Sequence, residues 1–388
     1  MAVVIAPPAA TALGPEELRR YARHLILPEI GRAGQERLKA ARVLLLGAGG
    51  LGAPAGLYLA AAGVGTLGVV DYDVVEESNL HRQVLFGQAD VGRPKLAAAL
   101  ERLAAANPLV ALEPHELRLD SANALDLIAS YDLVVDGTDN FPTRYLVNDA
   151  CVLAGKADVY GAIARFEGQV AVFWGAHGPC YRCLFPEPPP PGLVPSCAEG
   201  GVLGVLPGVI GSLQASEAIK LILGVGEPLI GRLLVFEALR ARVHELRVRK
   251  DPACPVCSEN PTLTALVDYE RFCAGEPAAA APSELEIAPR QLAEWRAAGR
   301  DLLILDVRTP DEAALAALPG TLLLPLDELP RRLGELDPTR PTVVHCHLGM
   351  RSLIATQLLR EHGFVNAWSL RGGIEAWSTE VDPTVPRY

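Results

Sequence analysis

The sequence lacks a surplus of positive charge. Its 388 residues hold 35 lysines and arginines against 46 aspartates and glutamates, which gives a net charge of −11 and an isoelectric point near 5.3. Proteins that bind nucleic acids use clustered basic surfaces to neutralise phosphates. We therefore expect no nucleic-acid partner.

The sequence also lacks a long hydrophobic run that is free of helix-breaking residues. Residues 43–70 carry no charge, but they contain eight glycines and Pro54; residues 200–216 contain five glycines, Pro207 and Gln214. Such residues interrupt a membrane-spanning helix. No basic segment precedes an apolar run near the N-terminus, so we expect no signal peptide, no membrane partner and a cytoplasmic protein.

Without a secretory context, the eight cysteines are expected to be reduced thiols that serve metal binding or catalysis. The chain length and the 50% hydrophobic composition predict two or three domains with cores of their own.

Prolines and glycines mark the expected domain boundaries. Residues 271–284 hold two prolines and few bulky apolar groups, so we expect a linker there. This linker separates a long α/β segment, residues 41–270, from a second unit at residues 285–388, and residues 1–40 precede both as a helical arm. Five prolines among residues 186–191 predict the start of a surface loop.

The first α/β segment contains a glycine-rich turn between an apolar strand and a helix. Its glycines are Gly47, Gly49, Gly50 and Gly52. The apolar residues 43–46 precede the turn, a helical pattern follows over residues 53–62, and a second apolar strand, residues 66–70, ends at Asp71. Glycines let the backbone approach a phosphate, the helix N-terminus attracts its charge, and the acid suits a ribose hydroxyl. We predict a nucleotide site in a Rossmann-like, mostly parallel sheet; the alternative is a tight turn without a ligand.

A dehydrogenase that binds a dinucleotide is the obvious class of protein with such a turn. The residues after Asp71 instead favour a compact triphosphate as the ligand. The polar and cationic residues of this stretch are Asn79, Arg82, Gln83 and Lys95. Arginine and lysine neutralise phosphate oxygens and stabilise the charge that builds up during transfer. A further buried strand, residues 132–136, is followed by Asp139 and Asn140. Ligands of such sheets bind at the carboxyl ends of the strands, so Asp139 is a candidate Mg²⁺ ligand. Taken singly, each residue could be a solvated loop charge.

Together these motifs resemble the ATP-binding motifs of the ubiquitin-activating-enzyme superfamily. The motifs that carry the resemblance are residues 47–52, Asp71 with Asp73, residues 78–80 with Arg82 and Gln83, Gly92 with Pro94 and Lys95, and residues 136–140. The most similar branch is the sulfur-carrier adenylyltransferases of molybdopterin and thiamine synthesis. The resemblance implies a homodimeric enzyme that uses MgATP to adenylate the C-terminal glycine of a small β-grasp sulfur-carrier protein, with Arg82 as a catalytic residue. It also implies that Arg23 reaches the ATP site of the partner subunit; composition alone favours an ordinary amphipathic helix for this arm.

Four cysteines form two C-x-x-C pairs that are separated by 70 residues: Cys180 with Cys183, and Cys254 with Cys257. Four thiolates suit a closed tetrahedral Zn²⁺ site, which has no open position for a substrate and is therefore structural. Two disulfides are the alternative, and a reducing compartment disfavours them. The resemblance supports zinc, because several members of the family hold zinc at matching positions.

The second unit contains a thiol at a strand-to-helix turn. Cys346 ends the apolar strand at residues 342–346, and residues 352–362 have helical apolar spacing. Backbone N–H groups, the positive helix end and Arg351 favour the thiolate, which suits a nucleophile that carries sulfane sulfur. Protein phosphatases place five residues between the cysteine and the arginine of such a loop, but only four separate Cys346 from Arg351.

This loop, together with residues 306–312 and 371–377, resembles a rhodanese domain that covers about residues 284–388, a smaller α/β unit. Residues 317–321 depart from the family pattern, which often has a histidine before an Ile-Pro-Gly-Ala turn. An inert rhodanese-like module is the alternative to an active one.

Cys197 lies between the proline-rich loop and an apolar helical run at residues 209–223, next to glycines, and is expected to be an accessible thiol. In the related activating enzymes a cysteine at the matching place on a crossover loop forms covalent intermediates; the alternative is an idle surface thiol. We therefore expect a persulfide on Cys346 to attack the acyl-adenylate. Cys197 would then release the thiocarboxylate and leave a Cys197–Cys346 disulfide.

The sequence leaves the partners of this chemistry open. A cysteine desulfurase or thiosulfate could load Cys346, and the carrier could serve molybdopterin synthesis, thiamine synthesis, tRNA thiolation or protein conjugation. A non-catalytic scaffold that binds carrier proteins is the alternative from a different functional class.

Overall fold

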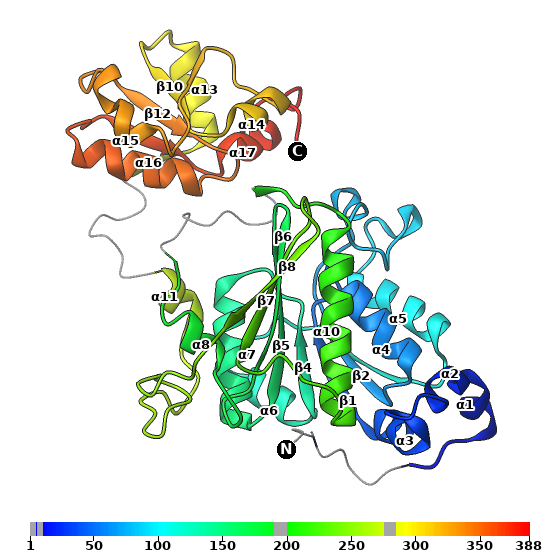
Figure 1. Ribbon diagram of the computed structural model, residues 1–388. Coiled ribbons are helices and arrows are strands. Elements are labelled where there is room, and N and C mark those ends of the chain that lie inside the picture. Colours follow the sequence, from blue (N-terminus) through cyan, green and yellow to red (C-terminus); the bar gives the residue numbers. More distant parts are fainter. Residues whose placement is uncertain (1–4, 6–10, 190–199, 275–284) are drawn as a thin grey trace. The chain divides into compact units, whose positions relative to one another are not determined.

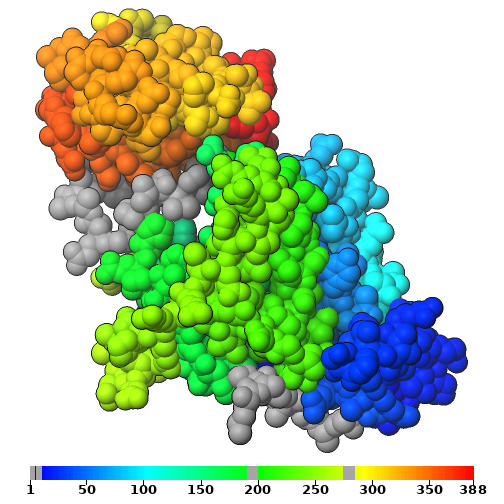
Figure 2. All heavy atoms as spheres, in the orientation of Figure 1, coloured from blue at the N-terminus to red at the C-terminus, as the bar shows by residue number. Residues whose placement is uncertain are grey.

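The computed structural model describes residues 5, 11–189, 200–274 and 285–388. The chain divides into two compact units, one reaching Cys273 and the other starting at Ala274 (Figures 1 and 2). The first helices, α1 (Pro15–Arg20), α2 (Ala22–Leu25) and α3 (Gly31–Ala40), precede the sheet of the N-terminal unit.

The N-terminal unit is built on an eight-stranded sheet with the order β3-β2-β1-β4-β5-β6-β7-β8 (Figure 1). The parallel strands are β1 (Arg42–Leu46), β2 (Thr66–Val70), β3 (Ala111–His115), β4 (Leu133–Asp136) and β5 (Ala157–Ala164). The antiparallel strands β6 (Glu167–Phe173), β7 (Arg232–Glu237) and β8 (Arg242–Arg247) extend one edge.

Helices cover both faces of this sheet, which explains why β1 is apolar throughout. Val43 and Leu45 pack into one core, with α4 (Gly52–Ala62), α5 (Lys95–Ala106) and α10 (Leu206–Leu223). Leu44 and Leu46 pack into the other core, with α6 (Ala124–Ala129) and α7 (Phe141–Ala154). A strand buried on both faces has no position where a polar side chain reaches water.

Among the described residues, α10 is the one helix that is long and apolar enough to cross a membrane. However, 61% of its hydrophobic window is buried inside the protein. Nε2 of Gln214 donates to the carbonyls of Asp136 and Val159 at 2.7 and 2.9 Å, and Gly161 leaves room for this amide. This burial and these hydrogen bonds to the sheet are typical of a helix in a domain core, so we interpret α10 as a core helix.

The C-terminal unit has a five-stranded parallel sheet with the order β11-β10-β12-β13-β9. Its strands are β9 (Glu286–Ile287), β10 (Leu303–Asp306), β11 (Thr321–Leu323), β12 (Thr342–His345) and β13 (Ala367–Leu370). Its helices are α13 (Pro289–Ala297), α14 (Pro310–Leu315), α15 (Leu329–Arg332), α16 (Met350–Glu361) and α17 (Gly373–Glu380). Val343 and Val344 face opposite cores, as expected of a central strand. The predicted fold class, a Rossmann-like mostly parallel unit plus a smaller α/β unit, is confirmed.

The expected linker begins as a helix. Residues 271–274 belong to α11 (Tyr269–Ala274), because Tyr269 and Phe272 pack into the core of the N-terminal unit.

Candidate nucleotide and thiol sites

The N-terminal unit has a pocket at the carboxyl ends of β1 and β4. These neighbouring strands lead into helices on opposite faces, so their connections diverge at this edge and leave a crevice, as in other open α/β sheets. The pocket brings together most of the predicted nucleotide residues: Gly47, Gly49, Gly50, Asp71, Arg82, Gln83, Lys95, Asp139 and Asn140.

Two glycines of the turn are required by its geometry. Gly47 has φ of +85°, a left-handed conformation that side chains disfavour. A Cβ on Gly52 would lie 1.8 Å from the carbonyl oxygen of Gly47. Gly52 therefore lets α4 begin directly against the turn, although it does not line the pocket itself.

Asp71 joins the end of β2 to this turn. Its Oδ2 accepts the N–H of Ala48 at 2.8 Å and its Oδ1 accepts the N–H of Asp73 at 2.9 Å. Burial raises the pKa of Asp71 above its ordinary value and outweighs these hydrogen bonds. The carboxyl group thus shapes the turn as well as facing the pocket.

Two of the cations that line the pocket, Lys95 and Arg82, are predicted nucleotide residues. Lys95 is nearly buried, and its Nζ lies 3.0 Å from Oδ2 of Asp73. Arg82 donates from Nη1 to the carbonyl of Ser78 at 2.9 Å, and the same atom contacts His81. Within the described residues its Nε and Nη2 make no hydrogen bond, so these donors remain for an anion such as a phosphate.

The other predicted residues of this site have separate positions. The Oδ1 of Asn140 caps α7 by accepting the N–H of Thr143 at 2.9 Å. Asn79 is buried in the short helix η1 (Glu77–Asn79) and does not line the pocket. Arg23 is exposed on α2, also outside the lining of this chain's own pocket.

Sequence reasoning missed Arg144, which lines the pocket from α7. Its Nη2 donates to the carbonyl of Thr138 at 3.2 Å, and its guanidinium lies over the rings of Phe141 and Tyr160. Burial would lower the pKa of Arg144, but Tyr160 and nearby carboxyl groups raise it overall, so this pocket residue stays charged. The only signal in the sequence is its place five residues after Asp139.

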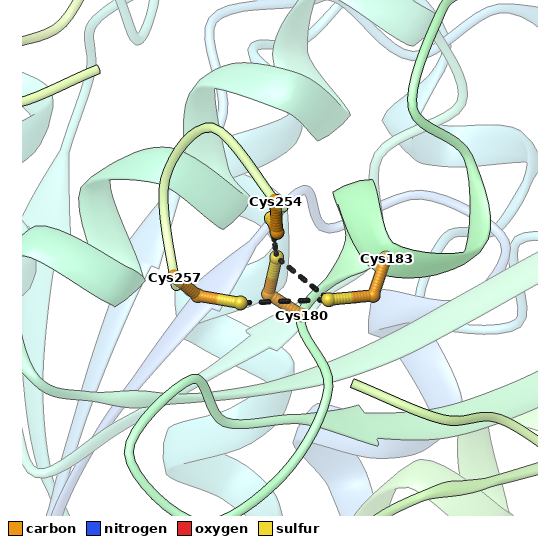
Figure 3. Close-up of side chains that lie close together, drawn as sticks. All are labelled: Cys180, Cys183, Cys254 and Cys257. Atoms are coloured by element: carbon orange, nitrogen blue, oxygen red, sulfur yellow. Dashed lines mark hydrogen bonds between the residues drawn. The ribbon is translucent and has the colours of Figure 1, made fainter. Parts of the chain in front are cut away.

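The four cysteines of the two C-x-x-C pairs come together (Figure 3). Cys180 and Cys183 flank the start of α8 (Tyr181–Leu184), and Cys254 and Cys257 come from the segment after β8. Their Sγ atoms lie within 4.8 Å of one another, with close pairs at 3.4, 3.5 and 3.9 Å. Tetrahedral Zn–S bonds of about 2.3 Å separate sulfurs by about 3.8 Å, so the cluster fits a zinc ion.

In the C-terminal unit, Cys346 lies between the end of β12 and α16. Gly349 donates its N–H to the Sγ of Cys346 at 3.1 Å, and the oxygen of Ser352 lies 3.6 Å from this sulfur. Gly349 has φ of +98°, which allows the loop to turn back over the sulfur. Cys346 is fully buried beneath its own loop.

Arg351, at the far end of the loop, forms two hydrogen bonds with Glu312, at 2.6 and 2.8 Å. Burial would raise the pKa of Glu312, but the bonds and charge of Arg351 outweigh it and hold that pKa below its ordinary value. Glu312 was not singled out by the sequence, since it lies 39 residues from its partner. The charge of Arg351 is thus partly balanced within the unit.

His347, the first residue after the thiol, is held by Tyr388. Their rings stack at 4.3 Å with an interplanar angle of 11°. The Tyr388 hydroxyl accepts a hydrogen bond from Nη1 of Arg308 at 2.7 Å, and Arg308 is fully buried against Asp306. The loop is therefore held at one end by the contact of His347 with Tyr388 and at the other by the ion pair of Arg351 with Glu312.

Cys197 lies outside the described residues. The other two cysteines are not near the thiol loop in sequence: Cys151 is buried in α7, and Cys273 is half-buried in α11.

Comparison with known proteins gives the family. Residues 21–256 match the ThiF family, and residues 288–380 match the Rhodanese-like domain. The probable adenylyltransferase/sulfurtransferase MoeZ of Mycobacterium tuberculosis is 52% identical over 98% of this chain and 97% of its own length. The adenylyltransferase and sulfurtransferase MOCS3 of Bos taurus is 45% identical over 98% of this chain and 90% of its own length.

Two further similarities cover the N-terminal unit. The sulfur carrier protein adenylyltransferase of Thermus thermophilus is 62% identical over 66% of this chain and 97% of its own length. The crystal structure of Escherichia coli MccB with ATP aligns with a TM-score of 0.54 and 24% identity over 62% of this chain and 73% of that one, which is a likeness of fold.

The chain belongs to the ThiF family and carries a C-terminal rhodanese-like domain. It is an enzyme, an adenylyltransferase and sulfurtransferase, as the motifs at the two turns predict.

Proposed function

We propose that this enzyme adenylates the C-terminal glycine of a small β-grasp sulfur-carrier protein with MgATP and then converts it to a thiocarboxylate. One pocket is lined by glycines of the turn, Arg82, Lys95 and Asp139, and this observation carries the proposal. The name of the Thermus thermophilus relative, a sulfur carrier protein adenylyltransferase, supports the substrate class.

In the first step a carboxylate oxygen of the carrier attacks the α-phosphorus of ATP. The bond from this phosphorus to the bridging oxygen breaks, and pyrophosphate leaves. Backbone N–H groups of the turn, the start of α4, Arg82 and Lys95 stabilise the negative charge that builds up on the phosphates. Asp139, which lines the pocket, would hold Mg²⁺, and the ion would neutralise phosphate oxygens.

In the second step the terminal sulfur of a persulfide on Cys346 attacks the acyl carbon, and AMP leaves. Cys197 then attacks Sγ of Cys346, the bond between this Sγ and the transferred sulfur breaks, and the thiocarboxylate leaves. The product is a Cys197–Cys346 disulfide, which an external dithiol reduces. The Gly349 N–H and the start of α16 support an anionic sulfur at Cys346. A cysteine desulfurase or another donor reloads this thiol.

The four clustered cysteines hold a structural Zn²⁺ in this proposal, because a closed thiolate site leaves no position for a substrate. The enzyme works as a cytoplasmic homodimer in which Arg23 completes the partner's ATP site. The exposed side chains Ile26 and Leu27, close to Arg23 in sequence, support an interface at this arm. The predicted domain boundaries and roles of site residues belong to the same proposal.

An activator for protein conjugation would share the adenylation step but would have no need of a sulfur-carrying unit. The rhodanese-like domain favours the sulfur route.

The test is Mg²⁺-dependent exchange of labelled pyrophosphate into ATP, with β-grasp carriers that end in Gly-Gly. We expect exchange with at least one carrier and none with the same carrier lacking its last glycine. Exchange with no such carrier would overturn the proposal. Binding of the carrier without ATP turnover would identify a scaffold, and binding of a nicotinamide cofactor would favour a dehydrogenase.

A further inference from the structure

The helix α11, the last element before residues 275–284, is attached to the N-terminal unit by a buried polar network. The Tyr269 hydroxyl donates to Oδ2 of Asp149 at 2.7 Å. Asp149 is fully buried and also accepts two hydrogen bonds from Arg182, each 2.8 Å long. Burial, and then the charge of Asp149, raises the pKa of the Tyr269 phenol, so it stays a donor.

Arg182 holds α11 through a second residue. Its guanidinium lies 4.5 Å from the ring centre of Phe272 and 4.9 Å from that of Tyr145, so it is enclosed between aromatic rings from α11 and α7. Arg182 belongs to α8, between Cys180 and Cys183, and Figure 1 shows α8 beside α11. Release of α11 would therefore remove one hydrogen bond from a buried ion pair and one ring from a buried cation.

The helix α11 and the residues just before it also contact the wall of the nucleotide pocket. Glu270 pairs with Arg118, and the carbonyl of Val267 accepts a hydrogen bond from the hydroxyl of Ser121. Arg118 lines the pocket, with its neighbours in the segment after β3. The chain thus leaves the N-terminal unit from a helix that contacts both the cysteine cluster's helix and the pocket wall.

This attachment fixes how much chain separates the two units. From Ala274 to Leu285 there are eleven Cα–Cα steps, which span at most about 40 Å. If α11 were released, the next anchor would be Val267, whose carbonyl accepts a hydrogen bond from the hydroxyl of Ser121, next to Leu266, whose side chain packs against the core of the N-terminal unit. The connection would then have eighteen steps, with a reach of about 65 Å.

We propose that α11 is a docking element that sets the length of this tether, and that Tyr269 and Arg182 are positioning residues for sulfur transfer rather than for adenylation. The inference rests on the proposed function. The effective concentration of a tethered group falls roughly as the −3/2 power of tether length, so lengthening the tether from eleven to eighteen steps lowers it about twofold. Release of α11 should therefore slow delivery of the Cys346 sulfur to the adenylate by this factor.

The experiment compares two routes to thiocarboxylate in the full-length enzyme. One uses Cys346 loaded with sulfane sulfur by a cysteine desulfurase and cysteine; the other uses free sulfide, which needs no tether. The carrier is a β-grasp protein ending in Gly-Gly that supports pyrophosphate exchange with the parent enzyme. If the parent shows no exchange with any carrier, the proposed function fails, which is distinct from failure of the tether.

Two variants change tether length by independent means. The double substitution Tyr269→Ala with Phe272→Ala releases α11, which hydrogen exchange of residues 269–274 verifies. An insertion of seven Gly/Ser residues after Ala279 adds the same number of steps and leaves α11 docked. We expect each to lower the rate of the Cys346 route about twofold and to leave the sulfide route and pyrophosphate exchange unchanged. Tyr269→Phe, which keeps the ring, should have a smaller effect.

A parental rate for the Cys346 route in either variant would overturn the proposal. So would protected α11 amides in the double variant, because the named side chains would then not hold the helix. Loss of pyrophosphate exchange in the double variant would assign α11 to the adenylation site and contradict the positioning role.

Discussion

Two turns of this chain share a local architecture and differ in what they hold. In the N-terminal unit β1 leads through the glycine turn into α4, and in the C-terminal unit β12 leads through the thiol loop into α16. Both turns place backbone N–H groups and the positive end of a helix at the carboxyl edge of a parallel sheet. The first turn is made of glycines, whereas the second carries Cys346, whose sulfur accepts the N–H of Gly349.

The charges around the two turns differ as well. Arg82 and Lys95 reach the nucleotide pocket from other segments, and Arg82 keeps donors for a ligand. In the thiol loop Arg351 is bonded to Glu312. The same turn can therefore hold a polyanion that comes and goes, or a sulfur that stays covalently attached, depending on which side chains surround it.

Removal of the Cys346 thiol should show the difference between the roles of the two turns with the largest effect. Cys346→Ala is expected to lower sulfur transfer to the carrier at least about 1,000-fold, because no other group carries the attacking sulfur. Pyrophosphate exchange should be unchanged, and free sulfide should restore thiocarboxylate formation. Cys273→Ala is the matched control. A loss of ATP turnover in Cys346→Ala with the fold intact would contradict the division between the turns.

The reciprocal substitution acts on the nucleotide pocket beside the glycine turn. Arg82→Ala should slow pyrophosphate exchange by about 100- to 1,000-fold, because one charged donor to the phosphates is lost. Sulfur transfer from loaded Cys346 to cyanide should stay at the parental rate. Arg93→Ala, which removes a cation that pairs with Asp90 and Glu101 outside the pocket lining, should leave both rates unchanged. Equal effects of the two substitutions would assign the rate loss to overall charge.

The cysteine cluster should matter for stability more than for chemistry. Cys183→Ser is expected to abolish stoichiometric zinc and to lower the melting temperature of the N-terminal unit by roughly 10 °C, since a closed metal site contributes to folding. Adenylation per folded molecule should change little. Metal analysis and calorimetry measure the effect, with Cys273→Ser as control. A metal-free preparation of full stability would refute the prediction.

The C-terminal unit should lose stability in mild acid. Burial lowers the pKa of His345, the residue before the thiol, to about 4, although Asp306 opposes the shift. The unfolded chain protonates this histidine near pH 6.5, so it binds more protons than the folded chain between pH 6.5 and 4. Stability is therefore fully present above pH 6.5 and falls as the pH drops toward 4, by up to about 3 kcal/mol.

Hydrogen exchange of peptides covering β12 measures this loss. His345→Phe removes the titration and should flatten the slope over the same pH range. Equal slopes in the parent and the variant would show that another group governs the acid response of this unit.

The sequence predicts the features that short spacing encodes. Strand, turn and helix follow one another within a few residues, so the sequence alone predicts that Gly47 and Cys346 each lie at the end of a strand. The pocket residue Lys95 could also be predicted, because it belongs to a recognisable motif. These features depend on local geometry, which the chain specifies locally.

The missed features are pairings across long sequence separations. Glu312 meets Arg351 only because α14 and the thiol loop share one edge of the sheet. Arg182 pairs with Asp149 because α8 packs on α7. Hydrophobic periodicity does not predict which charged side chains are buried together. Arg144 is intermediate: its spacing from Asp139 is visible in the sequence, but its orientation is set by the packing of α7.

The complete burial of Cys346 has a practical consequence for chemical labelling. A thiol covered by its own loop can meet an electrophile only when the loop opens far enough for that reagent to enter. A series of alkylating reagents of increasing size therefore becomes a gauge of the opening: small methylating reagents should modify Cys346 readily, and bulky maleimide dyes slowly. Covalent inhibitors of this enzyme would have to be chosen by the width of that opening before their reactivity is tuned.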